Sequence, residues 1–191
     1  PHYHTANPYS TLGYYFISDR EPHDSRDIIT EGTPGASGTP ATTFMASVRH
    51  ESDLENPTQS GHMMLGEDFR FTPTRQFTFS LPGRIEDSTV KMRCSFSAKS
   101  SGGVQLTFAC NGKTLTPSTA DRIPATTDLG ASVTARRECD MSGENLRLSI
   151  TAGPSGTVTY SRLDNITLCY ERSIAMPAVS YTHLRAHETV L

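Results

Sequence analysis

The chain has 191 residues, of which 35% are hydrophobic and 19% charged, and its formal net charge at pH 7 is -3. This near-neutral balance gives no electrostatic basis for binding nucleic acid, and no apolar run approaches the ~20 residues that a membrane-spanning helix needs. The 14 glycines and 12 prolines, with abundant serine and threonine, favour a turn-rich all-β chain over a helical one.

The first 40 residues read as the end of a preceding segment followed by a loop. Leu12–Ile17 contains three consecutive aromatic residues and is the strong strand candidate of this part. Residues 33–40 are dense in Gly, Pro, Ser and Thr and predict a loop. His2 and His4 would point the same way from an extended stretch, but two histidines without a third ligand favour surface positions over a metal site.

Three extended segments form the centre of the chain. Apolar and polar residues alternate from Gln76 to Leu81, from Val90 to Lys99 and from Val104 to Cys110. A period of two puts each apolar set on one face of a strand, so we expect one antiparallel sheet covered by a second layer. Ser100–Gly103 is expected to close a tight hairpin. Upstream, 42–48 is a strand candidate and 53–55 a candidate helical turn.

Downstream, Asn111-Gly112 is the strongest hairpin signal and predicts a return through Lys113 to Leu115. Further segments with strand patterns lie at 133–137, 146–150, 158–160 and 166–170. Roughly eight to ten short strands separated by turns are typical of an all-β, antiparallel β-sandwich or jelly roll. We expect this domain to span residues 41–176.

The last residues, 177–191, resemble translated sequencing-adapter read-through, so we treat them as a non-native tail. His183 and His187 imitate a helical zinc pair and are excluded from the functional argument. We expect the natural protein to continue past Met176.

Four cysteines occur without C-x-x-C spacing: Cys94, Cys110, Cys139 and Cys169. If a hairpin places Ala98 opposite Leu106, Cys94 lies opposite Cys110 and a bridge is geometrically allowed, although two small buried hydrophobic residues are the favoured interpretation. Cys139 follows two arginines that would favour a thiolate, but we favour a solvated loop thiol. No catalytic residue is predicted.

Tyr160, Asp164 and Asn165 are the candidate ligand-facing residues. Asp164-Asn165 precede the last predicted strand, where jelly-roll modules often carry binding residues, but a turn cap explains them equally well. The chain has no Trp, so Tyr160, with Tyr14 and Tyr15, is a candidate aromatic platform for a sugar.

Acidic clusters provide candidate calcium ligands: Glu51, Asp53, Glu55, Glu67 and Asp68. Their spacing is not that of a calcium-binding loop, so solvated turns are the favoured interpretation. We predict no metal and no cofactor.

The run Arg162–Arg172 resembles a segment of the PorU-like sortases of type IX secretion systems, a gingipain-type cysteine peptidase family of Bacteroidetes. In that family a similar strand closes the β-rich region before the peptidase domain. Other pieces follow in matching order over about residues 9–176: Tyr14-Tyr15-Phe16, Asp53–Pro57 with Gly61, Gly66–Phe69, Phe77–Phe79 and Asn111-Gly112.

The resemblance implies a non-catalytic β-sandwich region of a surface cysteine peptidase or sortase. Such a region would brace the peptidase domain or present cargo whose C-terminal sorting domain is cleaved. The family's catalytic His and Cys lie downstream, so we expect this chain alone to be inactive. The implied partners are the downstream peptidase domain, secreted cargo and other type IX components, and the implied location is the outer-membrane surface or the extracellular space.

Two alternatives stay open. The chain could be a carbohydrate-binding-type jelly-roll module of another secreted enzyme, or a structural domain of a surface adhesin. Separately, Asp87-Ser88-Thr89 matches a short O-glycosylation pattern of Bacteroidetes, which makes Ser88 a candidate glycan site. An ordinary polar turn is the interpretation we favour there.

Overall fold

The computed structural model describes residues 41–57, 64–124, 130–154 and 158–175. Its strands are β1 (Thr43–Glu51), β2 (Thr74–Ser80), β3 (Val90–Ser100), β4 (Val104–Cys110), β5 (Lys113–Thr114), β6 (Ser118–Ala120), β7 (Ala131–Cys139), β8 (Asn145–Pro154) and β9 (Val158–Ser173). Within these ranges, no helix is long and apolar enough to cross a membrane.

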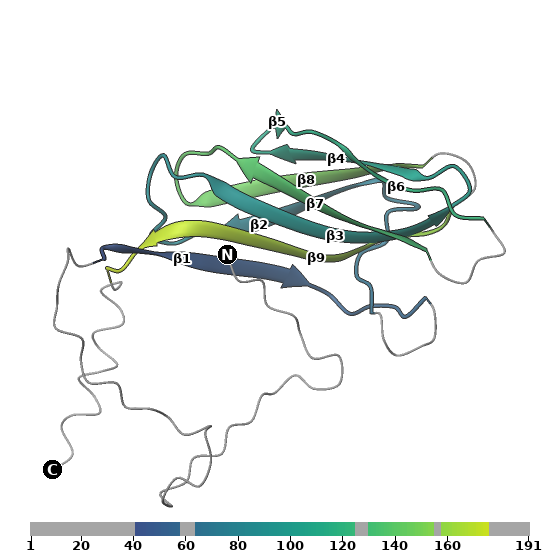
Figure 1. Cartoon of the computed structure of the whole chain (residues 1–191), viewed down its shortest axis with the longest axis horizontal. Helices are drawn as coiled ribbons and strands as arrows, with labels where there is room; N and C mark the ends of the chain where they lie inside the picture. Colours follow the sequence, from purple (N-terminus) through teal and green to yellow (C-terminus); the bar gives the residue numbers. More distant parts are fainter. Residues whose placement is uncertain (1–40, 58–63, 125–129, 155–157, 176–191) are drawn as a thin grey trace, which may run out of the picture. The chain divides into compact units, whose positions relative to one another are not determined.

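The strands form two antiparallel sheets packed face to face (Figure 1). One sheet has the order β1-β9-β3-β7 and the other the order β2-β8-β4-β5, with β6 paired to β4 beside β5. First and last strands are neighbours, and successive strands mostly change sheet, as in a jelly roll. The predicted fold class, an all-β antiparallel sandwich, is confirmed.

The prediction that the three central segments share one sheet is wrong. β3 lies in the first sheet, whereas β2 and β4 lie in the second, where both pair with β8. Alternation of apolar and polar residues fixes which side of a strand is buried, but strands from both layers bury their sides in the same core. The turn at 101–103 therefore crosses between layers instead of closing a hairpin.

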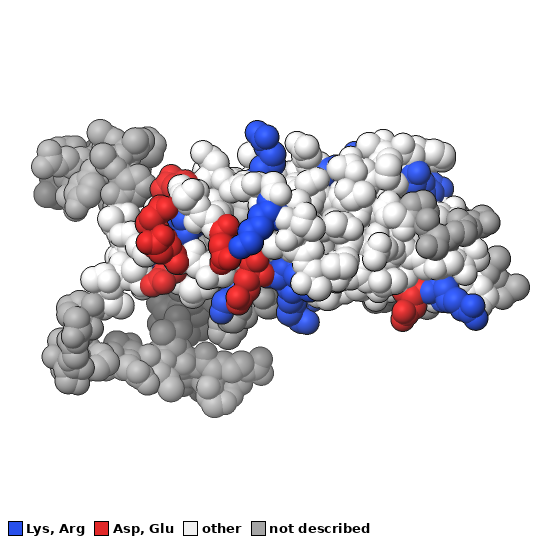
Figure 2. All heavy atoms as spheres, turned by 90° about the horizontal axis from the view of Figure 1, so that it is seen from above, with Lys and Arg blue, Asp and Glu red and all other residues white. Residues whose placement is uncertain are grey.

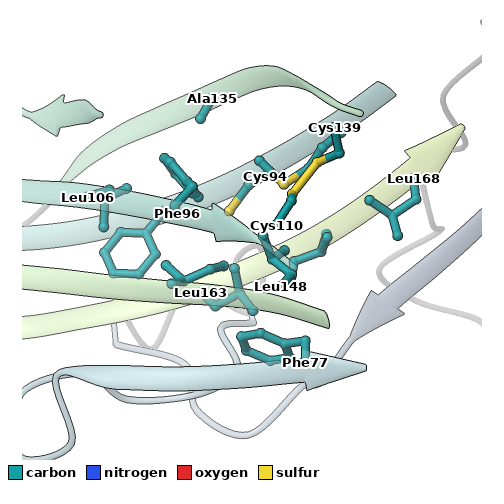
Figure 3. Close-up of a cluster of buried hydrophobic side chains, with 14 of the residues drawn as sticks. Phe77, Cys94, Phe96, Leu106, Cys110, Ala135, Cys139, Leu148, Leu163 and Leu168 are labelled. Carbon is teal, nitrogen blue, oxygen red and sulfur yellow. A yellow bond between two sulfur atoms is a disulfide. The ribbon is translucent and has the colours of Figure 1, made fainter. Parts of the chain in front are cut away.

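Alternation does predict the core correctly. Val90, Met92 and Phe96 of β3 are at most 1% exposed and face the equally buried apolar residues of β4 and β8. Phe96 packs edge-on against Phe69, with ring centroids 5.3 Å apart. Figure 3 shows part of this core. Its largest fully buried side chains are Tyr170, Phe69, Phe96, Phe108, Leu65, Leu81, Met92, Leu106, Leu146, Leu148, Ile150 and Leu163.

The Asn111-Gly112 hairpin is confirmed. Both residues have positive φ, 48° and 85°, as a two-residue type I′ turn requires. The return strand is short, because β5 pairs with β4 only through Ala109↔Thr114 and Cys110↔Lys113.

Other expectations for single segments have mixed outcomes. The strand expected at 42–48 is β1, and the helical turn expected at 53–55 is wrong because Glu55 forms an isolated β-bridge with Leu65. The strand expected at 12–17, the loop at 33–40 and the tail at 177–191 lie outside the described residues.

A buried arginine holds together the turns that precede β3 and β8. The Arg84 side chain is 0% exposed, and its guanidinium donates to the carbonyl oxygens of Ile85, Ser88, Met141 and Gly143 at 2.6–3.1 Å. Because these acceptors come from two separate turns, Arg84 ties 81–90 to 141–143. On the face drawn in Figure 2, most of the acidic side chains lie on one half, with Lys and Arg side chains beside them.

Candidate functional site

Asp164 and Asn165, expected just before the last strand, lie in a β-bulge inside one long strand. Against β3, Asn165 pairs with Ser95 and Leu163 with Phe96, which leaves Asp164 as the extra residue of β9. The bulge shifts the core-facing positions of β9 by one residue. Leu163 faces the core before the bulge, and Ile166 and Leu168 face it afterwards. A turn is unnecessary because the strand absorbs two consecutive polar residues and continues.

Asp164 also marks the point where the other neighbour of β9 changes. β1 ends with Glu51 opposite Asn165, and beyond the bulge the Gly66 amide donates to the Leu163 carbonyl at 2.7 Å. The Asn165 side-chain amide donates to Asp164 at 2.8 Å. Burial raises the pKa of the Asp164 carboxyl, and the nearby charge of Glu51 adds to this effect.

Tyr160, the candidate aromatic platform for a sugar, has a buried ring in this structure. The side chain is buried at 6% exposure, and its hydroxyl lies 3.4 Å from Ser97 Oγ. Asn165 is similarly buried at 8%, so of the three candidate ligand-facing residues only Asp164 is partly exposed. The structure brings Asp164 and Asn165 together, whereas Tyr160 pairs with Lys99 beyond the bulge.

Two of the candidate calcium ligands, Glu55 and Asp68, are paired with arginine side chains. Arg162 contacts both Glu55 and Asp68, and Arg70 donates to the Asp68 carboxylate at 2.6 and 2.8 Å. Burial alone would raise the pKa of Asp68, but the hydrogen bonds from Arg70 bring it below its usual value. These contacts fasten the segment before β2 onto β9.

Glu67 has a different partner, since its carboxylate lies 2.8 Å from His50 Nε2. Over the described ranges, no three acidic, cysteine or histidine side chains are grouped so that they could hold a metal ion.

Two of the four cysteines, Cys110 and Cys139, differ from the sequence expectations. Cys110 is bonded to Cys139, the last residue of β7, so Cys139 is a buried cystine partner and not a solvated loop thiol. Cys94 does not lie opposite Cys110, because β3 and β4 belong to different sheets. The interpretation of Cys94 as a buried packing residue holds, since Cys94 is free and buried.

Neither free thiol is set up as a nucleophile. Burial raises the pKa of the Cys94 thiol to about 12 and also raises that of Cys169. His50 is the one histidine in the described part of the chain, and it contacts Glu67 and the ring of Phe77 instead of a thiol. A cysteine nucleophile needs a base within hydrogen-bonding reach, and these residues do not provide that pair.

Ser88, the candidate glycan site, lies in the turn that Arg84 fastens. Its hydroxyl donates to the Ile85 carbonyl at 2.6 Å and lies 3.4 Å from an Arg84 nitrogen. The preceding residue, Asp87, has a φ of 61°. The hydroxyl therefore has a role within the turn, and glycosylation of Ser88 stays a prediction.

A groove lined mainly by polar residues lies on the outer face of the β2-β8-β4 sheet, where sequence reasoning identified no site. Its volume is about 560 Å³, within the usual range of small-ligand pockets. The lining includes Gln76, Thr78, Asn111, Arg147 and Ser149. In the segments 76–80 and 146–150 the polar residues alternate with apolar ones, which indicates that the polar side chains point away from the core. Only the pairing of β2 with β8 places these side chains side by side.

Comparisons with known proteins agree with the fold. No family model matches the chain, and no curated protein matches it. It is similar to dimeric latent PorU from Porphyromonas gingivalis, with a TM-score of 0.64 and 22% identity, over 75% of this chain and 14% of that chain. It is also similar to a family 35 carbohydrate-binding module from Clostridium thermocellum, with a TM-score of 0.37 and 8% identity, over 67% of this chain and 98% of that module. The chain thus shares a β-sandwich fold with a region of PorU and spans about one seventh of the length of that protein.

Proposed function

We propose that this chain is a non-catalytic β-sandwich region of a type IX secretion sortase related to PorU. The supporting observation is the likeness in fold to PorU over 75% of this chain but only 14% of that one, the relation of one region to a much larger protein. The ordered motifs that end in Arg162–Arg172 support the same assignment. In this proposal the region braces a downstream peptidase domain or presents secreted cargo to it.

A scaffold role agrees with the chemistry of the described residues. Two of the four cysteines form a disulfide, and burial raises the pKa of the other two. Catalysis by the parent protein, a gingipain-like cysteine peptidase or transpeptidase in this proposal, would then depend on residues of another domain.

Location at the outer-membrane surface or outside the cell is part of the proposal. Disulfides form and persist in oxidising compartments, so the Cys110–Cys139 bond favours an exported protein over a cytosolic one. The burial of Tyr160 argues against the alternative of a carbohydrate-binding module, because a buried ring offers no surface on which a sugar could stack.

The decisive test is the genomic reading frame through this region. We expect it to continue past Met176 into a peptidase domain that carries a His and a later Cys. A frame that continues into an unrelated domain, or that ends soon after Met176, would refute the assignment.

The expressed full protein then separates the two scaffold roles. It is compared with a variant that lacks residues 41–176, using the melting temperature of the peptidase domain and the kinetics of cargo cleavage. A bracing role predicts a lower melting temperature with little change in KM, whereas a presenting role predicts a higher KM at unchanged melting temperature. No change in either quantity would contradict both roles.

A further inference from the structure

The outer face of the β2-β8-β4 sheet presents side chains that donate and accept hydrogen bonds, arranged in rows. Gln76 lies beside Ser149 and Thr78 beside Arg147, and Ala109 flanks Ser149 on the other side. Neighbouring strands lie ~4.8 Å apart, so adjacent side chains of a row can contact the same small ligand. The row that contains Arg147 ends at Asn111. The backbone N–H of Asn111 donates to the Arg147 carbonyl oxygen at 2.8 Å.

One wall of the groove is fixed before any ligand binds. The Asn111 side chain accepts from the Arg147 amide at 2.8 Å and donates to the Asn145 carbonyl at 3.4 Å. The turn that carries Asn111 has the type I′ conformation that an Asn-Gly pair favours, with positive φ at Asn111 and Gly112. Preorganisation of this kind lowers the entropy lost on binding.

Side chains, not backbone groups, must recognise a ligand here. The backbone of β8 pairs with β2 on one side and with β4 on the other, so it offers no free edge to an added peptide strand. Ala109 and the buried Leu146 are the apolar residues of the lining, and the rest of its apolar surface comes from carbon atoms of the other lining residues, so no large apolar side chain forms a pocket for an apolar anchor. A peptide ligand therefore finds no unpaired strand along β8, and the free edge of this sheet lies on β2, at one side of the groove.

The chemistry of the lining matches a saccharide instead. Amides and hydroxyls such as those of Gln76, Thr78 and Ser149 both donate and accept, as do the hydroxyls of a sugar. Among the described lining residues, Arg147 carries the charge and none is acidic or aromatic. We propose that this groove binds an acidic oligosaccharide, with the Arg147 guanidinium pairing to a ligand carboxylate.

Two consequences follow for the ligand. Without an aromatic ring to stack on, a neutral sugar loses its main source of affinity, so binding should depend on the carboxylate. Arg147 is exposed, so the interaction should be weak and should weaken further with added salt. The proposal does not depend on whether a peptidase domain follows this chain.

The test is a titration of the full chain with tetragalacturonate, followed by calorimetry and by amide NMR shifts. Its methyl ester, the same sugar without the charges, and tetraglutamate, the same charges without the sugar, are titrated in parallel. We expect binding to tetragalacturonate alone, with shifts centred on Asn111, Arg147 and Ser149. No binding, equal binding of the methyl ester, or equal binding of tetraglutamate would each overturn the proposal.

Variants locate the site. Arg147→Ala should weaken binding about two- to fivefold, the factor expected when an exposed ion pair is lost, and Arg147→Lys should weaken it less. Arg136→Ala is the matched control, because it removes an exposed arginine from β7 in the opposite sheet. An equal loss in both variants would show attraction to overall charge and would refute the groove as the site.

Discussion

Cys110 at the end of β4 is bonded to Cys139 at the end of β7, so a covalent bond joins the two sheets across the core. The two residues are 29 positions apart, and the closed loop contains β5, β6 and β7. A crosslink of this span restricts the unfolded chain more than the folded one.

Removing this disulfide should lower the free energy of unfolding by about 3–4 kcal/mol, the loop-closure value for ~30 residues. The measurement is urea unfolding of the wild type and of Cys139→Ala, each with and without reductant. Reductant should shift the unfolding midpoint of the wild type but not that of the variant.

Cys94→Ala is the control, since it removes a buried sulfur from the same core without touching the disulfide. Its midpoint should remain sensitive to reductant. A wild-type midpoint that ignores reductant would mean that the bond is absent from the folded protein.

Replacing Arg84 should destabilise the protein strongly, because four carbonyl oxygens in two turns would lose their donor. We expect Arg84→Ala to lower the free energy of unfolding by about 3–5 kcal/mol. Arg84→Lys should cost less, and Ser88→Ala, which removes one hydroxyl from the same turn, about 1 kcal/mol. Equal midpoints for Arg84→Ala and Ser88→Ala in chemical denaturation would contradict this role.

Gly130 should not tolerate a side chain. A Cβ there would lie 2.0 Å from the Tyr160 hydroxyl oxygen and 2.7 Å from the Ala98 carbonyl oxygen. Gly130→Ala should therefore displace the buried ring and lower the free energy of unfolding by about 1–3 kcal/mol. Gly153→Ala is the matched control, because its Cβ would meet only the Gln105 carbonyl oxygen at 3.8 Å. Thermal melts that fall equally for both variants would show that contact with Tyr160 is not the cause.

Asp164 should make stability depend on pH with a definite sign. Its pKa is raised in the folded state above 3.8, so the folded protein holds this proton more tightly than the unfolded chain. The stability that this proton contributes is complete below the unfolded pKa and is lost as the pH rises through the folded pKa. At neutral pH the ionised carboxylate is thus less favourable in the folded protein than in the unfolded chain.

Asp164→Asn removes this titration and keeps an oxygen that accepts from Asn165. Relative to the wild type, the variant should gain stability as the pH rises from about 4 to about 7, measured by urea midpoints across that range. Asp68, whose pKa is lowered, gives a slope of the opposite sign but is present in both proteins, so it cancels in the difference. A pH-independent difference would contradict the raised pKa.

Much of the fold could be predicted from local pattern. Alternation identifies the inward faces of β2, β3, β4 and β8, and Asn111-Gly112 identifies a hairpin, because both signals depend only on neighbouring residues. Assignment of strands to sheets could not be predicted, because both layers bury residues in one core. The cystine was missed for the same reason, since pairing Cys94 with Cys110 assumed that β3 and β4 share a hairpin.

The candidate site shows the same limit. Two consecutive polar residues, Asp164 and Asn165, favour a turn in a sequence, yet a bulge accommodates them. The available signal is that Leu163 and Ile166 are three positions apart, which breaks the period of two. The groove was missed because Gln76, Arg147 and Asn111 become neighbours only through strand pairing between distant segments.

The pairing of β1 with β9 brings the two ends of the sandwich together. The Ile174 amide donates to the Thr42 carbonyl at 3.0 Å, so the polypeptide enters and leaves the described sandwich at one place. A module with adjacent entry and exit can be inserted into a loop of a host domain without forcing the loop's two halves apart. The same adjacency would allow a short linker to join Thr42 to Ile174, with new termini opened at an exposed turn such as Gly112.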